Sequence, residues 1–416
     1  MPRDIANLEL PAPVAGDGAG RHFLFVLGPF GPFTRRLADS LRRAGARCDR
    51  VLLNGGDVYD WGVRHAHLYQ GGLEGWSHWL ERLARAQGVT DLIIYGDSHP
   101  YCAGAARVAA RLLIGTHVLE QGYFRPFWIT LERNGVNGAS TLPRRVESYL
   151  GAAALAPEPT EEWLPPLTPP AVRRLAAYHT ALWLATPAFP AFRLPYDYSL
   201  PRQALGHARR YLRQRLVRGR LRRRLSRVLE ARGQLFLAIL QRPGDSQLRH
   251  HSPFPTVASF IDRVITSFAR HAPADARLLF KAHPLDHGLE PHRRNVEAAA
   301  RAAGVGGRVW FTDIGDLRTM TDFTVGVVTV NSTAGLTAID VGLPTVTLGA
   351  AIYDLPGLTH QGGLDGFWSA LEAPDRTVFE AFRKVVMART QISGAYALAR
   401  GIDLAVPETT RRLLAD

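Results

Sequence analysis

The sequence is poor in cysteine, with only Cys48 and Cys102 among its 416 residues. Two thiols are too few for a disulfide framework or a cysteine-based zinc site, and this scarcity is consistent with a reducing compartment. Long apolar runs are also missing, since none approaches the roughly 18 residues that a membrane-spanning helix needs. Residues 1–20 lack a basic stretch followed by an apolar one, so we expect a cytoplasmic protein with a flexible N-terminus.

Familiar nucleotide and metal motifs are absent as well. Neither GxGxxG nor a P-loop signature occurs, which argues against NAD enzymes and kinases. His250 and His251 lie close to Asp245, but neither belongs to an HxH or HExxH arrangement. We therefore predict no cofactor and no protein-bound catalytic metal.

The length of the chain predicts two domains. Single hydrophobic cores stop growing at about 250–300 residues, whereas this chain has 416 residues and 46% hydrophobic content. We expect an N-terminal domain over residues 21–200, a basic helical segment over 201–232, a C-terminal domain over 233–390 and a C-terminal helix over 391–416. The proline-rich stretch 156–170 predicts a surface loop.

Short apolar runs alternate with helical patterns in both halves of the chain. The first half shows this from His22 onward, with further strand-like runs at 91–97 and 116–123. The second half repeats it from QLFLAIL, with a clear helical pattern over 257–270. Such alternation is typical of parallel sheets with helices on both faces. The sequence therefore predicts an α/β fold with two Rossmann-like, doubly wound domains.

Net charge of +13 calls for an anionic partner, and much of the charge lies in one stretch. Twelve arginines, no lysine and a single acid, Glu230, occur from Arg202 to Arg232, with leucines at mostly helical spacing. This pattern predicts one or two basic amphipathic helices, suited to anionic lipid headgroups. A solvated helical face packed on its domain is the plainer interpretation, and nucleic acid is disfavoured because no nucleic-acid module accompanies the charge. The arginines expected at the membrane surface are Arg209, Arg210, Arg213, Arg220, Arg222, Arg223 and Arg224.

Ligands of open parallel sheets bind at the carboxyl ends of the strands, so polar residues directly after strands are the first candidates. One set is KAHP, with Lys281, His283 and Pro284. The other is Asn331, Ser332 and Thr333, which precede a helical pattern. Hydroxyls and free N–H groups at a helix start make an anion site, suited to a nucleotide phosphate. Taken alone, Ser332 or Thr333 is equally explained as a helix cap, and His283 as a structural histidine.

Two carboxylates follow strands elsewhere in the chain. Glu120 begins a dense polar and aromatic stretch, and Asp245 lies in the loop QRPGDSQ. Facing a cleft between the domains, they permit general acid/base or nucleophilic chemistry on a sugar. Arg125 is expected to pair with Glu120 or with an acidic substrate, and Asp97 and His99 end another strand.

These motifs together resemble the capsule polysaccharide biosynthesis proteins of the KpsS/LipB type. The resemblance rests on four segments: EQGYFRPFWITLERNGVN at 120–137, QRPGDSQ at 241–247, FKAHPLD at 280–286, and NSTAGLTAIDVGLPT at 331–345. It implies a GT-B-like fold, with an acceptor-side N-terminal domain and a CMP-sugar-binding C-terminal domain facing a cleft. It further implies a retaining β-Kdo transferase that moves Kdo from CMP-Kdo to phosphatidylglycerol or its lyso form.

The resemblance also implies roles for individual residues. Asp245 would be the nucleophile or the carboxylate that faces the anomeric carbon, although Gln241 and Ser246 in the same loop remain alternatives. Glu120 would be the acid/base residue, and His283 would stabilise the CMP phosphate together with Ser332 and Thr333. Partners implied by it are the inner-membrane surface and other capsule synthesis and export proteins.

Two other functions fit the same patterns. A CDP-polyol phosphotransferase of the teichoic acid type shares the HP motif and the Ser/Thr helix start. A non-catalytic scaffold for capsule assembly would bind nucleotide or lipid without needing the two carboxylates.

Overall fold

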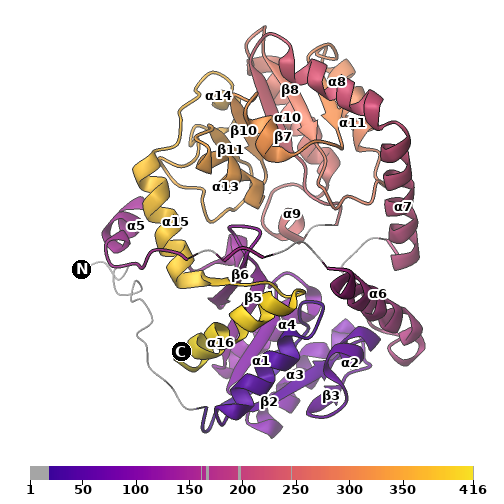
Figure 1. The fold of residues 1–416 in the computed structure, drawn as a ribbon, viewed down its shortest axis with the longest axis vertical. Coiled ribbons are helices and arrows are strands. Elements are labelled where there is room, and N and C mark those ends of the chain that lie inside the picture. Colours follow the sequence, from indigo (N-terminus) through magenta and orange to yellow (C-terminus); the bar gives the residue numbers. More distant parts are fainter. Residues whose placement is uncertain (1–17, 161, 165–167, 195–197, 245, 416) are drawn as a thin grey trace. The chain divides into compact units, whose positions relative to one another are not determined.

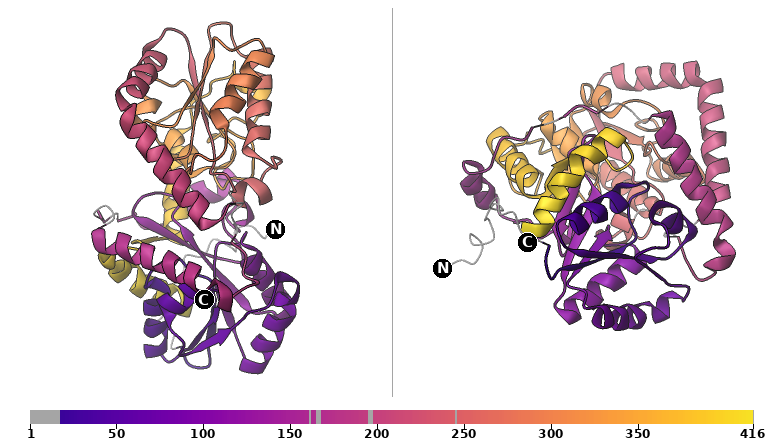
Figure 2. Two further views of the ribbon diagram at one scale, coloured as in Figure 1. Left: turned by 90° about the vertical axis from the view of Figure 1, so that its right-hand side faces the viewer. Right: turned by 60° about the horizontal axis from the view of Figure 1, so that its bottom comes forward.

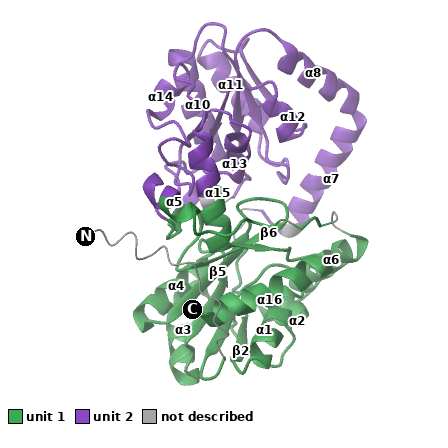
Figure 3. Ribbon diagram, turned by 60° about the vertical axis from the view of Figure 1, so that its left-hand side comes forward, with its two compact units in different colours: residues 1–142, 151–195, 383–416 green, residues 143–150, 196–382 purple. Residues whose placement is uncertain are grey.

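A computed structural model describes residues 18–160, 162–164, 168–194, 198–244 and 246–415, shown as a ribbon in Figure 1. The chain divides into two compact units (Figure 3): unit 1 comprises residues 1–142, 151–195 and 383–416, and unit 2 comprises residues 143–150 and 196–382. Within the described ranges, no helix is both long and apolar enough to cross a bilayer.

Unit 1 is built on a seven-stranded sheet of order β12-β6-β5-β4-β1-β2-β3. Its strands are β1 His22–Val26, β2 Arg47–Leu52, β3 Ala66–Leu68, β4 Asp91–Tyr95, β5 Gly115–Gln121, β6 Trp128–Arg133 and β12 Gln391–Ser393. The five strands β3-β2-β1-β4-β5 are parallel, whereas β6 and β12 are antiparallel additions at one edge. The parallel part has the 3-2-1-4-5 order of a Rossmann half.

Helices cover both faces of this sheet (Figure 2). They are α1 Phe33–Arg43, α2 Gly55–Trp61, α3 Leu73–Gln87, α4 Pro100–Leu112, α6 Pro169–Leu184 and α16 Ala399–Ala415. Because successive side chains of a strand point to opposite faces, Phe23 and Phe25 pack with α1 and α16, whereas Leu24 and Val26 pack with α3 and α4. A strand buried on both faces needs apolar residues throughout, which explains the run HFLFV.

Unit 2 contains a five-stranded sheet of order β11-β10-β7-β8-β9, and every pairing in it is parallel. The strands are β7 Leu235–Ile239, β8 Arg277–Lys281, β9 Val309–Thr312, β10 Gly326–Thr329 and β11 Thr345–Thr347. Read from β9, this is again the Rossmann order, so the chain reverses its direction of winding between β7 and β10.

The helices of unit 2 and of its junctions complete the chain. They are α5 Val146–Ala153, α7 Leu200–Leu216, α8 Arg218–Glu230, α9 Ser246–His250, α10 Val257–His271, α11 His292–Ala302, α12 Leu317–Thr321, α13 Thr333–Asp340, α14 Gly363–Phe367 and α15 Arg376–Thr390. Phe236 and Ala238 pack with α10 and α14 on one face of the sheet. Leu235 and Leu237 pack with α8, α12 and α13 on the other.

The predicted fold class, an α/β chain of two Rossmann-like doubly wound sheets, is confirmed. The basic stretch forms two helices, α7 and α8, which meet at Val217 and both belong to unit 2. The sheet of unit 2 is parallel throughout, whereas β6 and β12 run antiparallel at one edge of the sheet of unit 1. Residues 1–17 of the predicted flexible N-terminus lie outside the described residues.

Candidate functional site

The point where the winding of unit 2 reverses brings two polar side chains together. Gln241 follows β7 and Asn331 follows β10, and the two strands are neighbours in the sheet. Gln241 is buried, and its Nε2 donates to Oδ1 of Asn331 at 2.5 Å. Among the described residues, Oε1 of Gln241 has no hydrogen-bond partner. In doubly wound sheets this reversal is where ligands bind, and a buried unsatisfied amide oxygen suits a ligand that donates to it.

Ser332 and Thr333 start helix α13 at the same point. Ser332 is the N-cap, and its Oγ accepts from the N–H of Ala334 at 3.2 Å. The capping role that the sequence allowed for Ser332 is therefore real. A hydroxyl that accepts from the backbone still carries its own hydrogen, so Ser332 can also donate to an anion at the positive end of the helix.

A tyrosine fixes the first turn of α13 from behind. The hydroxyl of Tyr353 donates to the carbonyl oxygen of Ser332 at 2.5 Å. The approach is so close that a Cβ at Gly335 would lie 2.3 Å from that hydroxyl. Burial raises the pKa of Tyr353 far above its ordinary range, so the hydroxyl stays a donor. Only glycine at position 335 admits this arrangement without displacing the tyrosine.

The next strand end along the sheet, that of β8, carries Lys281 and His283. Lys281 is the last residue of β8 and is buried. Burial, with a smaller contribution from nearby Arg210, lowers the pKa of its ammonium group. Nδ1 of His283 accepts from the N–H of Leu285 at 3.0 Å. In the neutral ring this bond places the proton on Nε2, which makes Nε2 the donor that an anionic ligand needs.

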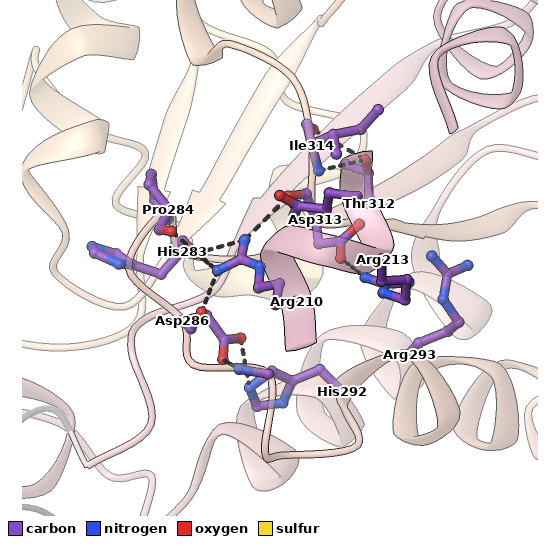
Figure 4. Close-up of polar contacts among 12 residues, drawn as sticks. Arg210, Arg213, His283, Pro284, Asp286, His292, Arg293, Thr312, Asp313 and Ile314 are labelled. Carbon is purple, nitrogen blue, oxygen red and sulfur yellow. Dashed lines mark hydrogen bonds and ion pairs between the residues drawn. The ribbon is translucent and has the colours of Figure 1, made fainter. Parts of the chain in front are cut away.

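Arginine 210 of helix α7 holds the loop that carries His283 (Figure 4). Its guanidinium donates to the carbonyl oxygen of Pro284 at 3.0 Å and to that of Asp313, after β9, at 3.1 Å. It also donates to the carbonyl oxygens of His283 and Asp286. The fork of a single arginine thus ties the strand-end loops of β8 and β9 together.

Arg213, one helical turn further on, forms an ion pair with the carboxylate of Asp313 (Figure 4). Two of the seven arginines expected at a membrane surface, Arg210 and Arg213, are therefore engaged inside unit 2. Gln214 adds a bond from its Nε2 to the carbonyl oxygen of Asp313 at 3.0 Å. Positions 210, 213 and 214 share one helical face through their i, i+3, i+4 spacing. This spacing is the signal in the sequence that could have distinguished Arg210 and Arg213 from the arginines that face solvent.

Asp286 completes the loop after the HP motif. Its Oδ1 accepts from the N–H of Gly288 at 2.7 Å, and its Oδ2 lies 3.4 Å from Nε2 of His292. Asp286 and His292 are both buried, and burial lowers the pKa of the imidazole. Asp286 therefore shapes the loop from its buried side, whereas Pro284 and Leu285 are exposed at its tip.

Glu120 lies in unit 1, as the penultimate residue of β5, and is half-buried. Its Oε1 accepts from the N–H of Gln121 at 2.8 Å, and its carbonyl oxygen accepts from the hydroxyl of Tyr396 at 2.8 Å. Gly96 has a positive φ of 64°, and a Cβ there would lie 3.1 Å from Oε2 of Glu120. The glycine thus leaves room for the carboxylate at the end of β4, beside the reversal of winding in unit 1.

A buried carboxylate that the sequence did not single out holds the loop after Glu120. Glu132 on β6 accepts from the hydroxyls of Tyr123 and Ser140. The hydroxyl of Tyr123 in turn accepts from the N–H of Asn137 at 2.7 Å. In the same loop, Nε of Arg125 donates to the carbonyl oxygen of Gly122 at 3.3 Å, a bond that stabilises the loop itself.

Asp97 and His99 have structural partners within unit 1. Oδ2 of Asp97 accepts from the N–H of Val136 at 3.0 Å. His99 caps helix α4 and lies nearly parallel to the ring of Phe192, at 14° between planes. Burial lowers the pKa of His99 to about 4, so its ring is neutral near pH 7.

Asp245, the predicted nucleophile, lies outside the described residues. Its role stays a prediction. The loop that contains it begins at Gln241, whose side chain is directed to Asn331.

Comparisons with known proteins agree with these motifs. A family model described as capsule polysaccharide biosynthesis protein matches residues 90–396. The chain is 33% identical over 379 residues to the capsule polysaccharide export protein KpsS of Escherichia coli, covering 91% of this chain and 97% of that protein. It is 32% identical over 396 residues to the capsule polysaccharide modification protein LipB of Neisseria meningitidis serogroup A, covering 91% and 92%. Among solved structures, the β-Kdo 2,7 transferase of Thermosulfurimonas dismutans KpsC aligns with a TM-score of 0.48 and 13% identity, covering 95% of this chain and 98% of that chain.

Proposed function

This chain belongs to the capsule polysaccharide biosynthesis family, and from that premise we propose that it is a retaining β-Kdo glycosyltransferase. It transfers Kdo from CMP-Kdo to phosphatidylglycerol or its lyso form and so begins the lipid linker of a capsular polysaccharide. The support for donor and acceptor is the resemblance of its four motifs to the KpsS/LipB type and the fit of the described site to one phosphate.

The observation that carries the proposal is the donor set at the reversal of winding in unit 2. Ser332, the start of α13 and the pair Gln241 and Asn331 lie at the ends of β10 and β7, and His283 at the end of the adjacent β8. A CMP-sugar has a single phosphate, which leaves as CMP when its charge is neutralised. Oriented N–H and O–H donors do this most effectively where water is excluded.

Within this proposal His283 donates from Nε2 to a phosphate oxygen, and Lys281 supplies positive potential from beneath the loop. Ser332 and Thr333 bind the same phosphate at the helix start. Asp245 faces the anomeric carbon as nucleophile or charge stabiliser, and Glu120 acts as the acid/base residue that takes the proton of the acceptor hydroxyl.

The test is an assay of the purified protein with CMP-Kdo and a fluorescent phosphatidylglycerol, followed by CMP release and mass spectrometry of the lipid. A lipid heavier by one Kdo unit establishes donor and acceptor together. Turnover of a CDP-polyol without turnover of CMP-Kdo would replace the proposal by phosphotransfer. Binding of CMP with no transfer to any lipid would favour a scaffold.

Single variants test the phosphate site. His283→Gln is expected to lower kcat by about 100-fold or more, the usual cost of one oriented donor. His271→Gln, at an exposed helix end of the same unit, is the control and should act as the unchanged protein. Equal activity of the two variants would remove His283 from the mechanism.

A further inference from the structure

Helix α7 turns its apolar side away from its own domain. Leu205, Leu212 and Leu216 form one stripe by their spacing of seven and four residues, and they are 60%, 56% and 74% exposed. The opposite side carries the buried Gln203 and the bonds from Arg210. A surface helix normally packs its leucines inward, so this helix is inverted with respect to its domain.

The domain-facing side of α7 is committed to that orientation by close contacts. Gly206 approaches the backbone so closely that a Cβ there would lie 2.5 Å from the carbonyl oxygen of His287. Arg210, Arg213 and Gln214 all bond to the loops after β8 and β9. The leucine stripe consequently cannot turn inward without breaking these contacts.

Arginines border the stripe. Arg209 lies on the same helical side, and both it and Arg215 are exposed. Helix α8 continues the charge at the exposed positions Arg218, Arg220, Arg222, Arg223, Arg224 and Arg227. The apolar side of α8 packs inward, with Val228 buried in the core of unit 2. Figure 3 shows both helices along one side of that unit.

We propose that the exposed side of α7, with the arginines of α8 beside it, docks on the surface of an anionic phospholipid bilayer, with the three leucines inserted among the acyl chains. Leucines on one helical side, bordered by guanidinium groups, match a bilayer surface in which anionic headgroups overlie apolar acyl chains. A second copy of the chain would bring like charges together, and a nucleic acid would leave the leucines unused.

This proposal adds to the proposed function and rests on it for its role, because a lipid acceptor must be reached from the membrane surface. The helix that docks is also the helix whose inner side holds the loop of His283. Its docking therefore brings the phosphate site of unit 2 to the membrane surface.

The test compares two double variants that each remove two exposed leucines. Leu212→Gln with Leu216→Gln changes the stripe, whereas Leu113→Gln with Leu155→Gln changes leucines that are 94% and 78% exposed in unit 1. Glutamine keeps a good helix propensity, and circular dichroism checks the fold. Binding is measured by co-sedimentation with vesicles of equal parts phosphatidylcholine and phosphatidylglycerol.

We expect the stripe variant to bind these vesicles at least about 10-fold more weakly, and the unit 1 variant to bind as the unchanged protein does. Equal binding of both variants would overturn the proposal, as would binding that is no weaker on vesicles of phosphatidylcholine alone. A loss of self-association in the stripe variant, with vesicle binding retained, would assign the surface to a second copy instead.

Transfer assays separate this proposal from the proposed function. The stripe variant should keep its rate on a short-chain, water-soluble lyso acceptor and lose it on an acceptor embedded in vesicles. If the unchanged protein transfers Kdo to neither acceptor, the proposed function fails, while the vesicle-binding result still decides the docking surface.

Discussion

Removing the side chain of Arg210 should loosen the loop that carries His283, although Arg210 is not itself among the residues proposed to bind the phosphate. Arg210→Ala removes two well-formed bonds, at 3.0 Å to Pro284 and 3.1 Å to Asp313, besides the other carbonyl contacts. At about 1 kcal/mol net for each of these two bonds, unfolding should become easier by roughly 2 kcal/mol. For a unit of this size that change corresponds to a Tm lower by about 4–8 °C.

The effect on transfer should exceed the effect on folding. A displacement of about 1 Å in a positioning group commonly costs on the order of 100-fold in rate, so we expect kcat/KM for CMP-Kdo to fall by roughly that factor. Arg210→Lys should recover little, because an ammonium group cannot span both loops as the guanidinium fork does. Both variants are assayed well below their Tm, so that unfolding does not contribute.

Arg209→Ala is the matched control, since it removes the same side chain at the adjacent exposed position. Because Arg209 borders the proposed docking stripe, the variants are compared on the short-chain, water-soluble acceptor. Its Tm should stay within about 1–2 °C of the unchanged protein. The reasoning is refuted if Arg210→Ala and Arg209→Ala have the same Tm and the same kcat/KM. It is refuted for catalysis alone if Arg210→Ala lowers only the Tm.

Three further predictions follow from buried groups. Burial lowers the pKa of His99 from 6.5 to about 4, so between these pH values the unfolded chain binds a proton that the folded chain does not. The free energy of unfolding should therefore fall by about 3 kcal/mol as the pH drops from about 7 to 4. In His99→Asn, chemical denaturation should show a decrease in the free energy of unfolding that is smaller by this amount. Burial raises the pKa of Cys48 and Cys102 to about 12, so a thiol reagent near pH 8 should label neither cysteine until the chain is unfolded, and prompt labelling of the native protein would contradict this. Gly335→Ala should destabilise the start of α13 by about 1–3 kcal/mol and weaken CMP binding measured by calorimetry. Gly219→Ala is the control and should leave the stability of the protein unchanged, because a Cβ added at Gly219 would meet no neighbouring atom within 4 Å.

Burial explains which elements could be predicted from the sequence. Central strands such as β1 and β7 are buried on both faces, so they leave continuous apolar runs between turn residues. Strand β6 lies in a polar and aromatic stretch, and β12 has only three residues, so neither carries such a run. Pairing between two segments so distant in the chain leaves no local pattern.

The positions of some candidate site residues were predictable from the chain alone, although their roles stay predictions. His283 and Ser332 directly follow strands, and strand ends of a parallel sheet meet at one edge. The role of Arg210 depends on which side of α7 faces the domain. For an amphipathic helix with arginines on one side and leucines on the other, the sequence pattern alone predicts that the leucines face the domain. In α7 the leucines face solvent instead, so the pattern predicts the wrong orientation for this helix.

The return of β12 and α16 to unit 1 has a consequence for synthesis on the ribosome. Residues of β6 are made early, yet their edge pairs with Gln391–Ser393 and the adjoining face is covered by Ala399–Ala415. At about 5–20 residues per second, the intervening chain takes on the order of tens of seconds to emerge. During that interval the nascent chain exposes an open strand edge beside uncovered apolar surface, which makes it a natural client for chaperones.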